Sequence, residues 1–185
     1  MSGIYIHIPF CKKACHYCNF HFSTLDNYKD EMVSALKKEI GLRKDETQAP
    51  IETIYFGGGT PSTLSATQIN LLIVEVFAQF NVVASPEITI EANPDDLTLA
   101  YLKAIKEIGI NRLSIGIQSF HDKELNMMNR VHNGKQAIKA VIRAKEFFDN
   151  ISIDLLFGTP DSNFTDWKEN LEIALKLDVP HISSY

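Results

Sequence analysis

Cysteines, long apolar runs and basic tracts are scarce or absent in this sequence, and each shortage excludes a class of protein. No apolar run approaches the roughly 18 to 20 residues that a membrane-spanning helix needs, so no segment is expected to cross a bilayer. The formal net charge of -5 and the lack of a basic tract give no electrostatic reason to expect nucleic acid or an anionic membrane as a partner. Because the cysteine count is odd, at three, and no signal peptide is recognisable, we expect no disulfides and a cytoplasmic location.

The rest of the composition is that of an ordinary soluble globular domain. Of the 185 residues, 45% are hydrophobic and 22% are charged, which is enough apolar material for a substantial core. No low-complexity linker divides the chain. Residues 1–185 are therefore expected to fold as one domain.

All three cysteines lie in one short stretch, as Cys11, Cys15 and Cys18. Three thiols with the spacing C-x3-C-x2-C on a loop can turn toward one inorganic centre. A [4Fe-4S] cube has four irons, so three thiolates leave one iron open for a small molecule. This motif predicts a reaction centre and not only an electron relay.

Two other uses of the cysteines are weaker. Zinc sites usually join two separated ligand pairs, whereas the histidines that could complete a zinc site here, His7, His16 and His21, crowd the same loop. A thioredoxin-like role for Cys15 and Cys18 would leave the first cysteine unexplained, and the pair does not open a helix in the expected context.

Apolar residues alternate between a period of two and a period near 3.6 along the chain, which predicts strands separated by helices. Strands are predicted at residues 3–9, 53–56, 87–93, 112–119, 151–157 and 181–185, and helices at 26–44, 65–80, 98–108, 134–148 and around Trp167, Leu171 and Leu175. Such crossovers imply parallel strands with right-handed connections. The expected fold class is α/β, a partial parallel (β/α)6 barrel that stops near its sixth strand; a three-layer Rossmann sheet is the alternative. We therefore expect a piece of a longer protein.

The two faces of each predicted strand differ in kind. One parity is branched and apolar, whereas the other is small or polar, and includes Tyr5, His7, Thr53, Tyr55, Thr89, Glu91, Asn93, Ser114, Gly116, Gln118, Ser152 and Asp154. An ordinary barrel lumen is filled with bulky aliphatic side chains, which this polar parity does not supply. Burying Glu91 and Asp154 without partners would cost several kcal/mol each, so a polar ligand or a cation should satisfy them. The polar face is predicted to line a ligand site.

The end of the second strand carries the glycine turn 57–61, where a ligand can approach the backbone because no Cβ blocks it. It should share one rim with the cysteine loop, because the carboxyl ends of parallel strands meet at one edge. Arg130 and His132, taken alone, are typical of surface residues. Asp154, in mid-strand, needs a partner, either Arg130 or a ligand hydroxyl.

The segments YIHIPFC, CHYCNF, TIYFGGGTPS, EITIEANPDDL, NRLSIGIQSF, NRVHN and IDLLFGTP together resemble the radical S-adenosylmethionine (SAM) superfamily, and within it the HemN/HemW family. The resemblance implies that Cys11, Cys15 and Cys18 hold a [4Fe-4S] cluster whose open iron takes the amino and carboxylate groups of SAM. It implies SAM contacts from Tyr5, Tyr17, Gly58, Gly59, Thr60, Glu91, Gln118, Arg130 and Asp154. A reduced cluster would then cleave SAM to methionine and a 5′-deoxyadenosyl radical, with electrons from a separate donor. No catalytic side chain is assigned.

The family has two branches, which differ just after the third cysteine. The oxygen-independent coproporphyrinogen III dehydrogenases, which carry out a radical oxidative decarboxylation in porphyrin biosynthesis, have C-x-C there. This chain reads Cys18-Asn19-Phe20, as HemW-type heme chaperones do. The resemblance therefore favours a chaperone that delivers heme to recipient hemoproteins, with the dehydrogenase as the alternative. Heme binding is expected of the full-length protein, whose C-terminal domain this chain lacks.

Overall fold

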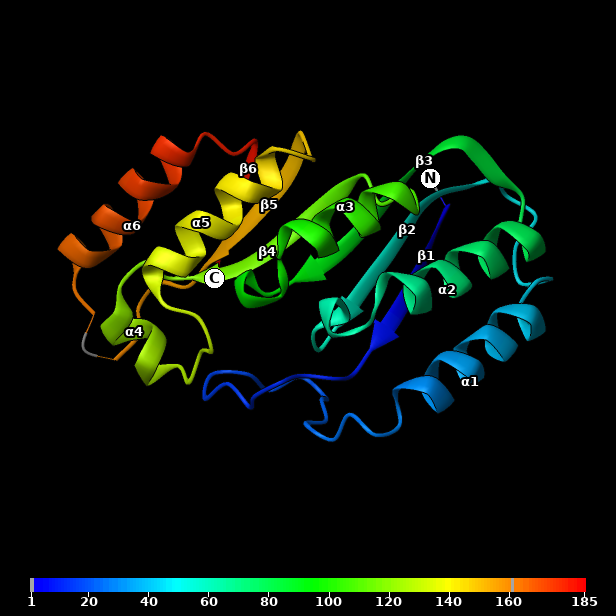
Figure 1. The fold of residues 1–185 in the computed structure, drawn as a ribbon, viewed down its shortest axis with the longest axis horizontal. Coiled ribbons are helices and arrows are strands. Elements are labelled where there is room, and N and C mark those ends of the chain that lie inside the picture. The colour runs from blue at the N-terminus through cyan, green and yellow to red at the C-terminus, as the bar shows by residue number, and fades with distance from the viewer. Residues whose placement is uncertain (1, 161) are drawn as a thin grey trace.

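The computed structural model describes residues 2–160 and 162–185, and these form one parallel six-stranded sheet (Figure 1). The strands are β1 (Ser2–Ile8), β2 (Ile51–Gly58), β3 (Val82–Ala92), β4 (Arg112–Gln118), β5 (Asn150–Leu155) and β6 (His181–Ser184). They lie side by side in chain order, each parallel to the next, and β1 and β6 form the two edges of an open sheet. This confirms the partial barrel. The alternative is wrong, because a Rossmann sheet reverses its strand order partway through.

The helices connect successive strands. They are α1 (Lys29–Leu42), α2 (Ala66–Gln79), α3 (Leu99–Glu107), α4 (Asp122–Met127), α5 (Gly134–Lys145) and α6 (Phe164–Leu177), with short 3-10 turns η1 (Pro61–Thr63) and η2 (Pro94–Asp96). Figure 1 shows α2, α3 and α5 lying along the same side of the strands. Crossovers of one hand between neighbours in a sequential sheet require this arrangement. In the described part of the chain, no helix is long and apolar enough to cross a membrane.

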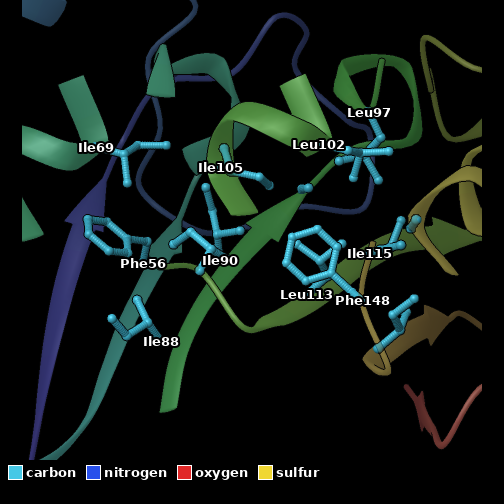
Figure 2. Packing of buried hydrophobic residues seen from close by; sticks show 14 of the residues in the cluster. Phe56, Ile69, Ile88, Ile90, Leu97, Leu102, Ile105, Leu113, Ile115 and Phe148 are labelled. Atoms are coloured by element: carbon cyan, nitrogen blue, oxygen red, sulfur yellow. The ribbon is translucent and has the colours of Figure 1, made fainter. Parts of the chain in front are cut away.

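The core lies between this helical layer and the apolar parity of the strands. Leu113, Ile115 and Ile117 of β4 are fully buried, and Figure 2 shows the side chains of Leu102 and Ile105 from α3 in the same cluster. Complete burial of one such aliphatic side chain stabilises the fold by about 1.5–3 kcal/mol. The alternation in the sequence thus directs one face of each strand into the core and leaves small or polar side chains on the other face.

Side-chain caps mark the starts of α2, α3, α5 and α6. Ser65 accepts a hydrogen bond from the backbone N–H of Gln68, whose side chain accepts one from the backbone N–H of Ser65, so the predicted capping box begins α2. Gly109 has φ +98° just after α3, as expected for a glycine that ends a helix. The first helix starts at Lys29 and not at residue 26, and α4 was not predicted at all.

Candidate functional site

The cysteine loop leaves the carboxyl end of β1 and is fastened at its base. The backbone N–H of Cys11 donates to the carbonyl of Ser23 (2.9 Å), and the N–H of Ser23 donates to the carbonyl of Pro9 (2.7 Å). These bonds close residues 11–22 into a loop above the edge of the sheet. The thiols are half-buried within it.

The glycine turn after β2 packs directly against this base, as predicted. The N–H of Thr60 donates to the carbonyl of Phe10 (2.8 Å), and the hydroxyl of Thr60 lies 3.4 Å from the Sγ of Cys11. A Cβ on Gly59 would lie 2.9 Å from the carbonyl oxygen of Phe10 and 3.0 Å from the Sγ of Cys11. Gly58 has φ +116°, which L side chains rarely adopt. The turn therefore needs both glycines to sit against the cysteine loop.

The tip of the cysteine loop is held by the end of α4. The N–H of His16 donates to the carbonyl of Met128 (3.2 Å), and its ring Nδ1 donates to the carbonyl of Met127 (2.8 Å). The side-chain amide of Asn129 donates to the carbonyl of Ala14 (2.8 Å). Asn129 reaches this position with φ +59°, a conformation that asparagine tolerates better than most residues. The unpredicted helix is thus part of the site.

A cavity of about 370 Å³ lies among these segments, within the range of about 300–1,000 Å³ that is typical of small-molecule sites. All three cysteines line it, and so do eight of the nine predicted cofactor residues, namely Tyr17, Gly58, Gly59, Thr60, Glu91, Gln118, Arg130 and Asp154. Tyr5 lies outside the lining: it is 57% exposed, and its hydroxyl lies 3.0 Å from the Nδ1 of His7. Contact of Tyr5 with a cofactor stays a prediction.

The three thiols line one cavity, as a shared cofactor requires. A [4Fe-4S] cube binds each thiolate to a different iron, so its ligands can stand around a cavity of this kind. Burial raises the pKa of the Cys11 thiol, which makes the ligand-free thiolate less favourable there.

Two carboxylates, Glu91 and Asp154, face the cavity, and neither makes a salt bridge with a lysine or arginine among the residues that the structure describes. Glu91 accepts hydrogen bonds from the hydroxyl of Tyr55 (2.7 Å) and from the N–H of Gly58 (3.2 Å), and burial raises its pKa. Asp154 accepts one long hydrogen bond from the hydroxyl of Ser114 (3.4 Å). Burial first, and then the charge of Glu91, raise the pKa of Asp154 to about 6. Both groups would gain from a ligand that offers hydroxyl or amino hydrogens.

Arg130 spans the cavity wall instead of pairing with Asp154. Its Nη2 donates to the carbonyl of Gly116 (2.6 Å) and to the Oδ1 of Asn93 (2.7 Å). Its Nη1 points to the Sγ of Cys15 (3.5 Å) and the hydroxyl of Tyr17 (3.3 Å). The Nε is buried, with no partner among the described residues. A guanidinium in this place can attract an anionic ligand group, and it lies beside the thiol of Cys15.

Burial raises the pKa of Tyr17 to about 12, so its phenol stays protonated over the physiological range.

Gln118 ends β4 at a register shift and has φ +67°, which turns the chain where the cavity begins. His132 is not on the surface: it is 3% exposed, and its Nε2 donates to the carbonyl of Ile117 (3.1 Å). The NRVHN segment, residues 129–133, is too short to show a periodic pattern, so the sequence did not indicate that His132 is buried.

Several residues of the cavity wall carry no prediction from the sequence. Phe20 and Phe22 line it from the cysteine loop, and Leu156 and Tyr185 line it from the ends of β5 and β6. The two phenylalanines alternate after Cys18, which is a usable signal for a shared face. The other two depend on how loops meet in space, and no local pattern marks them.

Comparison with known proteins agrees with this geometry. The family model described as the radical SAM superfamily matches residues 5–174. A protein of Bacillus subtilis (strain 168) named heme chaperone HemW is 41% identical over 193 residues, which cover 100% of this chain and 50% of that protein. A protein of Synechocystis sp. (strain ATCC 27184 / PCC 6803 / Kazusa) with the same name is 38% identical over 194 residues, covering 100% of this chain and 46% of that protein. The chain thus spans about half the length of these curated relatives.

A solved structure has the same fold along nearly the whole of this chain. Coproporphyrinogen III oxidase (HemN) from Escherichia coli, a radical SAM enzyme, superposes with a TM-score of 0.89 and 28% identity, covering 99% of this chain and 44% of that one. The radical SAM superfamily implies a [4Fe-4S] cluster and SAM, and three thiols and several polar side chains line the cavity. The family match runs over most of the sequence, and this chain belongs to the radical SAM superfamily.

Proposed function

We propose that this protein is a HemW-type heme chaperone, which holds a [4Fe-4S] cluster on Cys11, Cys15 and Cys18 and delivers heme to recipient hemoproteins. The observation that carries the proposal is that eight relatives named heme chaperone HemW are 33–41% identical to this chain across 99–100% of its length. The sequence Cys18-Asn19-Phe20 is the form expected of that branch. A cytoplasmic location and a separate electron donor belong to the proposal.

In this proposal, different cavity residues bind different chemical groups of SAM. Carboxylates such as Glu91 and Asp154 accept hydrogen bonds from hydroxyl and amino groups, and Arg130 attracts a carboxylate. The backbone at Gly58 and Gly59 allows close approach because no Cβ intervenes. When bound, a reduced cluster supplies the electron for reductive cleavage of SAM, while the protein orients both groups and excludes water.

A second candidate is oxygen-independent coproporphyrinogen III dehydrogenase, because the fold superposes on the Escherichia coli oxidase with a TM-score of 0.89. That reaction is associated with a further cysteine two positions after the third, where this chain has Phe20. The shared fold supports both branches equally, whereas the residue after the cysteine motif separates them. We therefore place the chaperone first.

The test uses the full-length protein, reconstituted anaerobically with iron and sulfide. A brown protein with about four irons per chain is expected, and replacing any one of Cys11, Cys15 and Cys18 by alanine should bleach it. Heme titration should then saturate at a fixed stoichiometry, and heme should pass to apomyoglobin, used as an acceptor probe. A protein that cleaves SAM and decarboxylates coproporphyrinogen III but never binds heme would sink the chaperone and leave the dehydrogenase.

A further inference from the structure

The side-chain amide of Asn93 connects two of the three cysteines through polar contacts. Its Oδ1 accepts from the Nη2 of Arg130 (2.7 Å), whose Nη1 points to the Sγ of Cys15 (3.5 Å). Its Nδ2 donates to the Oγ1 of Thr60 (3.4 Å), whose hydroxyl points to the Sγ of Cys11 (3.4 Å). Contacts therefore run from Cys11 through Thr60, Asn93 and Arg130 to Cys15.

The chemistry of the groups fixes the direction of every contact in this series. Arginine has only donors, so the Asn93 atom that faces Arg130 must be the carbonyl oxygen, and the amide nitrogen must face Thr60. Because Thr60 receives that N–H, its own single hydrogen is free to point at the Sγ of Cys11. Both cysteines thus receive a donor, and Asn93 sets the orientation of each.

Asn93 is itself held rigidly at the end of β3. Its backbone N–H donates to the Oγ of Ser62 (3.2 Å), and the hydroxyl of Ser62 donates to Asp96 (2.6 Å). Asp96 in turn pairs with Lys12, next to Cys11 on the cysteine loop. The amide is therefore placed by a network that also ties down the loop, as an orienting group requires.

We propose that Asn93 is a positioning residue that holds Thr60 and Arg130 as donors to the Cys11 and Cys15 thiolates, and that it thereby raises the reduction potential of the cluster. The inference rests on the cluster assignment of the proposed function. A reduced cluster carries one more negative charge than an oxidised one. Hydrogen bonds to its sulfurs and a nearby cation stabilise the reduced form, so they raise the potential.

Asn93→Asp tests this with almost no change of shape. Both carboxylate oxygens accept, so the hydroxyl of Thr60 should turn toward residue 93 and away from Cys11, while Arg130 becomes paired with a negative charge. We expect the midpoint potential of the reconstituted cluster, measured by an EPR-monitored redox titration without SAM, to become more negative than in the wild type. Iron should stay at about four per chain.

Asn150→Asp is the matched control, because it adds the same charge at an exposed position that begins β5, at the opposite end of the sheet. It should leave the potential unchanged. An unchanged or more positive potential in Asn93→Asp, with full iron content, would overturn the inference.

Thr60→Val is a second variant that keeps the test decisive if Asn93→Asp fails to load iron. It removes the donor to Cys11 but leaves the contact between Asn93 and Arg130, so it should also lower the potential. A Thr60→Val cluster with the wild-type potential would contradict the inference just as directly. Failure of the inference can be told apart from failure of the proposed function. A wild-type protein that holds no cluster refutes the proposed function. An iron-loaded wild type whose variants have the same midpoint potential refutes only the role of Asn93.

Discussion

Replacing Asp154 by asparagine should make the metal-free protein more stable at neutral pH. The carboxylate is buried, its single hydrogen bond from Ser114 is long at 3.4 Å, and the negative charge of Glu91 faces it. Asparagine keeps the shape and an acceptor oxygen for Ser114 but carries no charge. The change therefore removes the free-energy cost of burying a charged carboxylate beside Glu91.

The size of the penalty follows from the pKa of Asp154, which is raised from 3.8 to about 6. A raised pKa means that the folded state prefers the protonated form. The stability that this preference contributes is complete below pH 3.8 and is lost as the pH rises through about 6. Two pH units correspond to at most about 3 kcal/mol, and partial access of solvent from the cavity reduces this to about 1–2 kcal/mol. For a chain of this size, that is a rise in Tm of about 2–8 °C at pH 8.

The assay is thermal or urea unfolding of wild type and Asp154→Asn at several pH values between 4.5 and 8. The difference in the free energy of unfolding should grow with pH and level off above about pH 7. Asp149→Asn, an exposed carboxylate just before β5, serves as the control and should show no such trend. The reasoning is refuted if Asp154→Asn is less stable than the wild type at pH 8, or if the difference between the two does not depend on pH.

Three further changes probe the core, the glycine turn and the buried histidine. Leu102→Ala, at a side chain with 0% exposure, should lower the free energy of unfolding by about 2–5 kcal/mol in a urea titration; a smaller loss would contradict the packing in Figure 2. Gly59→Ala puts a methyl 3.0 Å from the Sγ of Cys11, so iron content after reconstitution should fall to less than half. Gly41→Ala on α1, where the added methyl would meet only a side-chain oxygen of Glu75 at 4.0 Å, should retain it. Burial lowers the pKa of His132 to about 4, so the stability that the neutral ring contributes is complete above pH 6.5 and is lost as the pH falls toward 4. His132→Gln should therefore show a smaller difference in the free energy of unfolding between pH 5 and pH 8 than the wild type. An equal difference would exclude His132 as the source of the pH dependence.

Alternation along the strands was enough to predict both the fold class and much of the cavity. On β5, Ile153 is fully buried against the helical layer, while its neighbour Asp154 lines the cavity. On β3, Ile90 and Glu91 divide in the same way. Side chains in a strand point to opposite faces in turn, so an apolar and a polar parity in the sequence must become a core face and a cavity face.

The parts that could not be predicted depend on contacts between segments far apart in the chain. Helix α4 has only six residues and buries only Glu124 and Leu125, which is too short for a helical period to stand out. Just after this helix, the side-chain amide of Asn129 donates to the carbonyl of Ala14, which lies 115 residues earlier in the chain. Likewise, Tyr5 has the parity of the polar face, yet it lies on the edge strand β1, is 57% exposed and does not line the cavity, which strand parity alone does not indicate.

In the open sheet the two faces of the strands contribute differently to the stability of the fold. In a closed barrel both parities are packed, so a change on either face disturbs the core. Here the helix-facing parity supplies the burial energy, and the other parity holds charges that the unliganded fold only partly satisfies, as the raised pKa of Asp154 indicates. A ligand that donates hydrogen bonds to those carboxylates would recover part of that cost. The same groups that weaken the empty fold therefore favour its occupied state, so binding of such a ligand should stabilise the wild type more than Asp154→Asn.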